Sequence, residues 1–450
     1  MSDINQIVSS TITRTSAAAT LPGFGVPAVF AQFAAGTKGF AASGVGSRTR
    51  PYFDTASMLT DGWAATDSVY LWASSVFAQN PRVPKIMVGR IDSGDASVAA
   101  SGDAIRAEND DFYCFEVAGN RGVKIVLSTN LITGNSVASS INGTAIGPIV
   151  YATSHAATMT AWETAIETAL GAGTVATVSG NEMLVYKPGT DLNIATCAVT
   201  LGASQPTVTI SYPLDATKTK AWMAWTETQK KLYFFQESDA AAYATDTGST
   251  GTAGLIEYAR LMNYERTVGV WHATNTEYLV AAWIGDQLPY GPGANTWAFK
   301  TMAGVSTDNL TTTQETYIRG KGGNVYTLTA GVASTYAGSC AKAQRYIDDQ
   351  RFLDWQDTQI KLDFANLQFQ AGKIPFTDAG IQMVQLMVQA SLEKGVRAGG
   401  WAPGSIVVTV PKAKDVSSTN KANRNLPDVK WSATLSGAVH TVQVTGTVSV

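Results

Sequence analysis

The residues best suited to acid–base or metal chemistry in this 450-residue chain are its three histidines. His155, His272 and His440 fall in separate segments, and none is followed by a second metal ligand three or four residues later. A helical metal site needs that spacing, because side chains three or four positions apart share one face of a helix. We therefore interpret each histidine as a structural residue held by hydrogen bonds.

Motifs for nucleotides and nucleophiles give little support for an enzyme. Gly23-Phe24-Gly25-Val26-Pro27-Ala28 has the spacing of a dinucleotide-binding turn, but the pattern before it predicts no strand and a proline interrupts it. Such a turn must join a strand to the start of a helix. The sequence contains neither G-x-x-x-x-G-K-[ST] nor G-x-S-x-G. We expect no cofactor and no metal.

Adjacent carboxylates occur twice, at Asp110-Asp111 and at Asp348-Asp349. Neighbouring side chains point apart on a strand or a helix, so these pairs favour helix caps and surface charges over an acid–base couple. A catalytic triad assembled from distant segments leaves no linear trace, however. An enzyme therefore stays open as an alternative.

Composition favours assembly. Charged residues make up 15% of the chain, against roughly 25% in ordinary soluble domains, and there are eleven tryptophans. Contact surfaces between proteins are depleted in charge and enriched in aromatic residues; the alternative is a low-charge globular protein. A net charge of -3 gives no basic excess for nucleic acid. No apolar run reaches the ~18 residues of a membrane span.

Cysteine usage and the first residues indicate the compartment. Cys114, Cys197 and Cys340 are odd in number and far apart, which argues against a disulfide framework or a zinc site and fits a reducing cytoplasm. The segment 1–6 lacks the basic and apolar regions of a signal peptide.

Strands and helices alternate along two stretches, which is typical of an α/β domain. The patterns predict strands at 85–90, 111–117, 231–235 and 267–272, and helices at 97–109, 216–228, 254–264 and 276–286. The stretch 120–213 interrupts this alternation and holds only seven charged residues. There we predict one helix and several strands, at 160–171, 147–152, 183–186, 198–201 and 207–212. We interpret the stretch as a small α+β domain inserted into a loop.

The last third is predicted to be mainly helical, over 338–370 and again after a cap at Thr377 or Asp378. The second helix should end at Gly395, and its apolar stripe is Ile381, Val384, Val388 and Leu392. A polar, basic link at 411–430 follows.

Both ends of the chain are predicted to be extended arms. Residues 439–450 alternate with period two, which predicts a half-buried strand. Its apolar face carries Val442, Val444, Val448 and Val450. Residues 1–25 include a β-prone segment at 7–14. A strand at a chain end frays unless it is paired, so we expect the last one to join a sheet of its own chain or of a neighbour.

Residues 214–450 contain an ordered series of short motifs. They include Trp283-Ile284-Gly285, Pro292-Gly293-Ala294-Asn295-Thr296-Trp297, Lys321-Gly322-Gly323-Asn324, Tyr346-Ile347-Asp348-Asp349, Lys373-Ile374-Pro375-Phe376-Thr377-Asp378 and Gly446-Thr447-Val448-Ser449-Val450. In these motifs the chain resembles the tail sheath proteins of contractile-tailed bacteriophages, in a branch often catalogued as a domain of unknown function. The resemblance is weaker over 1–119 and weakest over 120–213.

The resemblance implies an α/β fold, α+β overall, with a mixed sheet of subtilisin-like topology and no protease triad. The implied divisions are an N-terminal arm (1–25), a sheath core (26–119 and 214–300), an outer decoration domain (120–213), a tube-facing domain with its linker (301–430) and a C-terminal strand-exchange arm (431–450). The implied arm contacts are Ile7, Val8, Ile12, Val439, Val442, Val444, Val448 and Val450, and the implied tube-facing helix carries Ile381, Val384, Val388 and Leu392.

By the same resemblance, six-membered rings of identical copies stack helically around a tail tube and contract to drive it through a host envelope. The implied partners are further copies, the tail tube protein, and the baseplate and tail terminator proteins. The implied location is the phage tail in the virion, after synthesis in the cytoplasm of the host bacterium. The alternatives are another tail or virion structural protein, and a hydrolase with a subtilisin-like fold.

Overall fold

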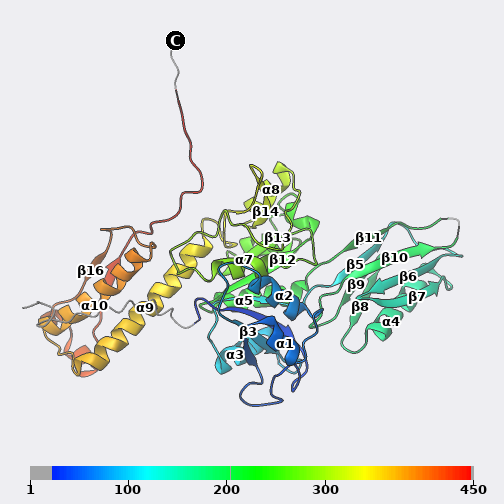
Figure 1. The fold of residues 1–450 in the computed structure, drawn as a ribbon. Helices are drawn as coiled ribbons and strands as arrows, with labels where there is room; N and C mark the ends of the chain where they lie inside the picture. The colour runs from blue at the N-terminus through cyan, green and yellow to red at the C-terminus, as the bar shows by residue number, and fades with distance from the viewer. Residues whose placement is uncertain (1–22, 203, 447–450) are drawn as a thin grey trace, which may run out of the picture.

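The computed structural model describes residues 23–202 and 204–446. It shows a central α/β core with the insert on one side and a helical C-terminal lobe on the other (Figure 1). The expected arm residues Ile7, Val8 and Ile12, and also Val448 and Val450, lie outside the described residues.

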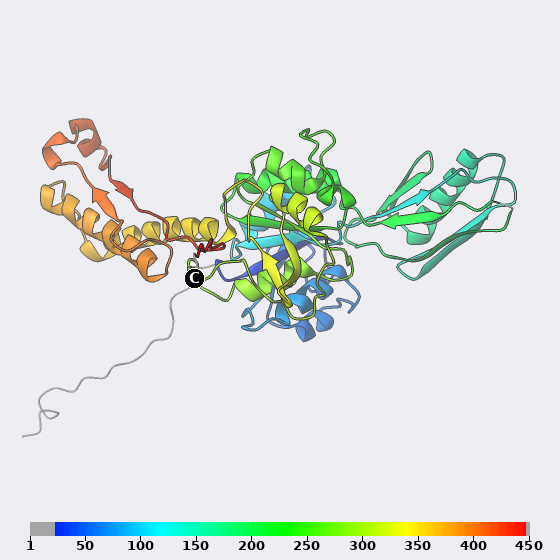
Figure 2. The same ribbon diagram turned by 90° about the horizontal axis from the view of Figure 1, so that it is seen from above.

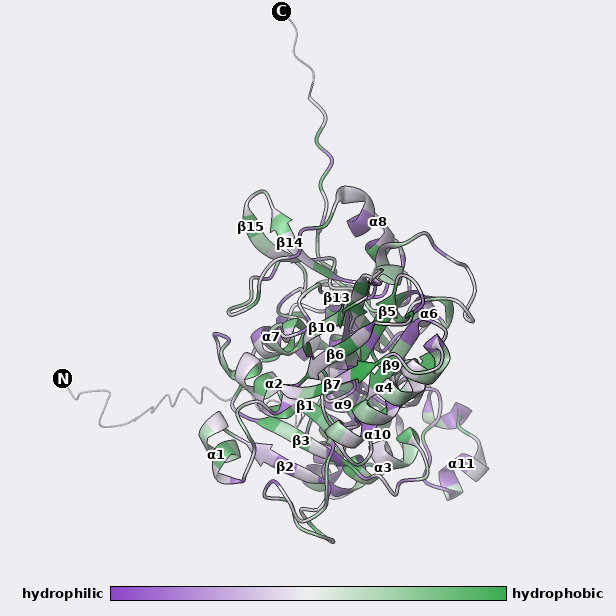
Figure 3. Ribbon diagram, turned by 90° about the vertical axis from the view of Figure 1, so that its right-hand side faces the viewer, coloured by the Kyte–Doolittle hydropathy of each residue, from purple (hydrophilic) through white to green (hydrophobic). Residues whose placement is uncertain are grey.

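A six-stranded mixed sheet forms the core. Its strand order is β13 (Thr267–Trp271), β12 (Leu232–Glu237), β4 (Cys114–Val117), β1 (Pro27–Gln32), β3 (Ile86–Ile91) and β2 (Thr49–Tyr52). The first five run parallel, and β2 is antiparallel to β3. The parallel strands are buried along nearly their whole length, because helices cover both faces. Figure 3 shows the hydrophobic colour of β1 and β3. The expected α/β fold with a mixed sheet is confirmed.

Helices cover the two faces of this sheet (Figure 2). One apolar cluster lies under α2 (Ser68–Phe77) and α7 (Leu279–Gln287), with α1 (Thr55–Thr60) beside it. The opposite cluster lies under α3 (Val98–Glu108), α5 (Ala216–Glu227) and α6 (Leu255–Leu261), near the 3-10 turn η2 (Ala240–Tyr243). The predicted helices at 97–109 and 216–228 are confirmed, and the Ser97 and Asp215 side chains cap them.

The chain itself contacts part of each edge of the core sheet. At β2, the Glu108 carboxylate accepts hydrogen bonds from the backbone N–H groups of Ser47, Arg48 and Thr49, at 2.8–3.3 Å. At β13, Asn324 exchanges backbone hydrogen bonds with Trp271 and Gly269. Contacts of this kind hinder pairing with a strand from another chain.

The expected boundary at 300 between core and C-terminal domain is misplaced. Residues 301–346 form α8 (Thr312–Gly320) and a hairpin of β14 (Val325–Thr329) and β15 (Val332–Tyr336), which the sequence reading missed. Met302, Tyr326 and Cys340 belong to one core cluster, and Ile318 and Val325 to the other. This segment therefore belongs to the core.

The insert has a hydrophobic cluster of its own. Two antiparallel sheets, ordered β10-β6-β7 and β11-β5-β9-β8, share a cluster with α4 (His155–Leu170). Their bounds are Val123–Leu127 for β5, Ser136–Ile141 for β6, Thr144–Val150 for β7, Val175–Ser179 for β8, Glu182–Tyr186 for β9, Ile194–Thr200 for β10 and Val208–Ser211 for β11. Trp162, Ile166 and Leu170 of α4 are buried in that cluster.

The joint between insert and core is tightly packed. The Asp191 carboxylate accepts hydrogen bonds from the backbone N–H groups of Asn120 and Arg121 and from the Tyr278 hydroxyl, at 3.0–3.2 Å. A Cβ added to Gly189 would lie 1.9 Å from the carbonyl oxygen of Gln32, so the two backbones touch here. These contacts fix the insert on the core.

The C-terminal lobe is built on two long helices, α9 (Ile347–Ala371) and α10 (Asp378–Arg397). Of the two expected cap positions, Thr377 is the one that caps α10. Gly395 does not end that helix: it lies inside it, where a Cβ would meet Gln356 and Trp401 at 2.3–2.4 Å. The stop comes at Gly399, whose φ is +90°. Strands β16 (Val407–Thr409) and β17 (Lys430–Ser432) pair in a small sheet, with η3 (Ala413–Asp415) and α11 (Ser418–Ala422) between them.

Candidate assembly surfaces

The three histidines lie far apart and hold structure. His272 is fully buried, with Nδ1 3.0 Å from Asp308 and Nε2 3.2 Å from Glu277. His155 accepts a hydrogen bond from the backbone N–H of Leu131, and His440 lies beside Thr296. Among residues 23–202 and 204–446, no three His, Cys, Asp or Glu side chains are grouped to hold a metal ion.

Of the two adjacent acidic pairs, Asp110 and Asp111 are ion-paired, whereas Asp348 has a buried Oδ1 without a hydrogen-bond partner. Asp110 pairs with Arg106 and Lys231, and Asp111 with Lys85. Asp348 and Asp349 occupy the first turn of α9, where the helix dipole favours negative charge. Burial and the proximity of Asp349 raise the pKa of Asp348 to about 6.

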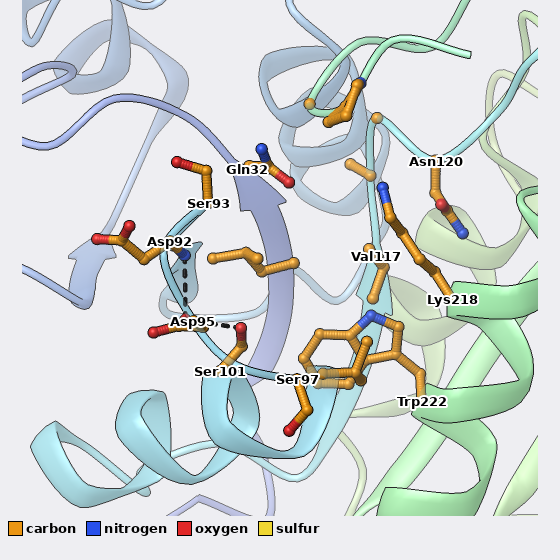
Figure 4. Close-up of a pocket in the computed structure, with 16 residues that line it drawn as sticks. Gln32, Asp92, Ser93, Asp95, Ser97, Ser101, Val117, Asn120, Lys218 and Trp222 are labelled. Atoms are coloured by element: carbon orange, nitrogen blue, oxygen red, sulfur yellow. Dashed lines mark hydrogen bonds between the residues drawn. The ribbon is translucent and has the colours of Figure 1, made fainter. Parts of the chain in front are cut away.

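A cavity of about 350 Å³ opens at the carboxyl ends of β1, β3 and β4 (Figure 4), a common place for ligands in α/β sheets. Its Asp95 is held by Arg48 at 2.6 and 2.7 Å and by the Ser101 hydroxyl at 2.7 Å. The Arg48 hydrogen bond is the main reason why the pKa of Asp95 falls to about 2. The described residues that line the cavity include no histidine or cysteine. These hydrogen bonds of Asp95 hold the loop after β3 in place.

The C-terminal segment 437–446 leaves the molecule as an extended arm (Figure 1). Val439, Val442 and Val444 are 81%, 75% and 85% exposed. Up to residue 446, the segment pairs with no strand of its own chain. Residues 431–436 do not belong to this arm, because Ser432 pairs with Val407 and Ser436 donates its backbone N–H to Gly400.

The small sheet of the lobe is a candidate to accept a further strand. In the described chain it consists of β16 and β17 alone. Val407 and Trp431 are 55% and 41% exposed on it. A two-stranded sheet is marginal by itself and presents unpaired N–H and C=O groups to a further strand.

The stripe expected to face a tube is internal. Ile381, Val384, Val388 and Leu392 are at most 7% exposed, and Val388 and Leu392 share a cluster with Phe352 and Trp401. The helical spacing therefore identified a stripe that faces the core of the lobe. The expectation that these four side chains face a tube needs correction. The outward apolar residues of the lobe are Leu362, Phe364, Phe369, Met383 and Leu386.

The far half of α9 exposes large apolar side chains among polar ones. Leu362 and Phe369 are 41% and 85% exposed and lie seven residues apart, on one face of the helix. Exposed apolar groups gathered on one lobe mark an interaction surface. No helix in the described ranges is long and apolar enough to cross a membrane.

No protein-family model and no curated protein match the chain. Among solved structures, the chain is similar to the protein of a cryo-EM structure titled as an extracellular contractile injection system, PVC sheath complex in contracted state. The TM-score is 0.54 at 10% sequence identity, over 98% of this chain and 96% of that chain. The likeness spans core, insert and lobe together. We conclude that this chain has the fold of a contractile sheath protein.

Proposed function

We propose that this protein is the structural subunit of a contractile phage tail sheath. Copies polymerise as stacked six-membered rings around a tail tube, joined by strand exchange of their terminal arms. The observation that carries this proposal is the exposed, apolar arm at 437–446 on a sheath-like fold. The role is structural and involves no catalysis.

The arm's acceptor follows from which sheet edges are open. In the core sheet, Glu108 contacts the start of the β2 edge and Asn324 pairs with the β13 edge. The β16–β17 sheet of the lobe is short, small and partly apolar on its surface. The arm of one copy adds a strand to this sheet of another copy, with backbone hydrogen bonds giving affinity and alternate side chains giving register.

Many such contacts must act together. Burying one valine contributes roughly 1.5–3 kcal/mol, while ordering each backbone residue costs roughly 1–2 kcal/mol. One arm alone is therefore close to balance. Ladder hydrogen bonds and the repetition of the contact around a ring make the assembly stable.

Each remaining region has a role in this arrangement. The lobe faces the tube protein through the outward side of α9 and α10, and the insert decorates the outside. Baseplate and tail terminator proteins bind the two ends of the stack. The head-to-tail contacts between identical copies generate rings and helical stacks. During contraction the bodies rotate while the arms stay paired, which drives the tube through the host envelope.

Deleting residues 438–450 tests the arm directly. We expect the shortened chain to stay folded, with only a small change in melting temperature from the loss of the His440 contacts, and to sediment as a monomer under conditions in which the full chain polymerises. The control is the full-length chain, prepared and assayed in the same way. Normal tubes from the deleted chain would refute the arm assignment.

A phage-like injection particle is the second candidate, because the similar solved structure belongs to an extracellular contractile injection system. The proposed contacts between subunits are the same for a phage tail and for an injection particle. Particles purified with this protein should carry a DNA-filled head if it serves a phage, and none if it serves an injection particle.

A further inference from the structure

The C-terminal arm is attached to the body beyond its first residue. Of residues 437–446, His440 alone is partly buried, while its neighbours on both sides are exposed. The His440 ring meets Phe299 and Tyr346 edge to face, with centroid distances of 5.7 and 5.2 Å. Its Nε2 lies 3.1 Å from the Thr296 hydroxyl. One side chain thus holds the arm.

The slot for His440 belongs to the junction between core and lobe. Thr296 and Phe299 lie in the segment after α7, and Tyr346 is the residue before α9. The backbone N–H of Ser436 is hydrogen-bonded to Gly400 in the lobe. Gly437, next in the chain, has a φ of +60°, a conformation that favours glycine. The arm root therefore spans two fixed points, Ser436 and His440.

Charged groups surround this slot. Asp348 and Asp349 in the first turn of α9 lie close to it. Burial raises the pKa of Asp349, while Arg345 and His440 act on it in the opposite direction. Lys300 and Arg345 supply positive charge on the other segments, near Asp348 and Asp349 respectively. The slot accepts a polar aromatic ring.

We propose that His440 is a releasable clasp that fixes the root of the C-terminal arm and, when it lets go, makes residues 437–440 available as extra reach. Four residues span at most about 13 Å when extended, at roughly 3.3 Å per residue. The proposal rests on the proposed exchange of arms, because extra reach lets an arm strand stay paired with a neighbour while the two bodies move apart.

The contacts suit a reversible device. One hydrogen bond and two ring contacts hold the clasp, and they oppose the conformational freedom gained by the freed residues. The residues on either side of His440 are exposed. Nothing covalent has to break for the arm to lengthen.

Spin labels in the unassembled chain test the clasp without requiring a sheath. One nitroxide is placed on Thr441→Cys, next to the clasp, and a second variant carries it on Gln443→Cys, beyond the clasp. Cys114 and Cys340 are buried, and labelling the parent chain measures the background from Cys197. Sedimentation confirms that the sample is monomeric.

The clasp predicts a mainly slow spectrum at residue 441 and a fast one at residue 443. His440→Ala should make the spectrum at 441 as fast as that at 443, and His440→Tyr, which keeps a ring, should restore most of the slow component. With a second label on the exposed Glu393→Cys, the distance distribution to residue 443 should extend by up to about 13 Å in His440→Ala.

Equal mobility at residue 441 with and without His440 would overturn the proposal, and so would an unchanged distance distribution. Thr296→Val is a second test that leaves the arm sequence intact. It removes the hydrogen bond to His440 and should raise part of the fast component of the spectrum at residue 441. Because every measurement uses monomers, a failed clasp is distinguishable from a failed sheath.

Discussion

Arg266 and Asp354 form a two-pronged ion pair, with guanidinium nitrogens 2.6 and 2.8 Å from the two carboxylate oxygens. The Tyr113 hydroxyl donates to the same carboxylate at 2.8 Å. Arg266 precedes β13 in the core, and Asp354 lies in α9, the helix that reaches into the lobe. Their side chains are 15% and 6% exposed. The pair therefore ties the lobe to the core sheet.

Asp354→Ala should destabilise the fold by about 3–5 kcal/mol, because it leaves the Arg266 charge buried without a partner. Asp357, one turn along the same helix, pairs with Lys230 and Lys361 near solvent. Asp357→Ala is the matched control and should cost about 1 kcal/mol or less. Urea unfolding of the two variants measures both costs. Similar losses would mean that the buried pair does not hold α9.

Stability should fall as pH rises towards 8. Burial raises the pKa of Glu116, whose carboxyl accepts a hydrogen bond from the Trp72 indole, to about 8. The folded chain then keeps a proton that the unfolded chain loses above its ordinary pKa, near 4.3. Between those two values, each pH unit costs about 1.4 kcal/mol of unfolding free energy for this group.

Glu116→Gln keeps the shape and a hydrogen-bond acceptor but cannot titrate. Its unfolding free energy should therefore depend less steeply on pH between about 4.5 and 8, with the remaining slope due to other groups such as Glu237, whose pKa burial also raises to about 8. Denaturant titrations at a series of pH values give the two slopes. Parallel slopes in variant and parent would contradict a protonated Glu116.

The two faces of the arm should respond differently to charge. Val444 lies on the apolar face predicted for the strand, and Gln443 on the polar one. Val444→Asp should lower the association constant at least tenfold, equivalent to about 1.4 kcal/mol per arm, while Gln443→Asp should leave it nearly unchanged. Both sites are exposed, so neither variant should alter monomer stability. Pelleting assays give the polymerised fractions, and equal effects would exclude a paired strand.

Gly189 should tolerate no side chain. Gly189→Ala places a Cβ against the Gln32 carbonyl at a φ of +77°, whereas Gly180→Ala has a φ of +60° and open space around it. Both substitutions carry the backbone cost of about 1–2 kcal/mol. The clash should add about 1–3 kcal/mol at Gly189 alone. Thermal unfolding compares them, and an equal cost would mean that insert and core do not touch at this point.

The sequence predicted elements well where one segment decides its own structure. Thr377 was one of the two cap positions expected for α10, and the helix expected at 160–171 begins only a few residues earlier. The β14–β15 hairpin was missed although Ala330-Gly331 separates two β-prone runs. Both residues have positive φ there, as a tight two-residue hairpin turn requires.

Partners were much harder to predict than elements. The spacing of Ile381, Val384, Val388 and Leu392 identified an apolar face, but periodicity cannot tell whether another helix of the same chain covers it. The core–lobe boundary was misplaced because residues 301–346 pack into both core clusters, through contacts with segments that are distant in sequence. Arg351 shows the same limit: it donates to the carbonyls of Phe24, Leu288 and Tyr290, far away in sequence.

Electron microscopy of the purified full-length protein tests the central claim most directly. The account predicts hollow cylinders of stacked six-membered rings, in which the arm of one subunit lies beside the β16–β17 sheet of another. Particles that never close into a cylinder, with each arm folded onto its own subunit, would contradict it.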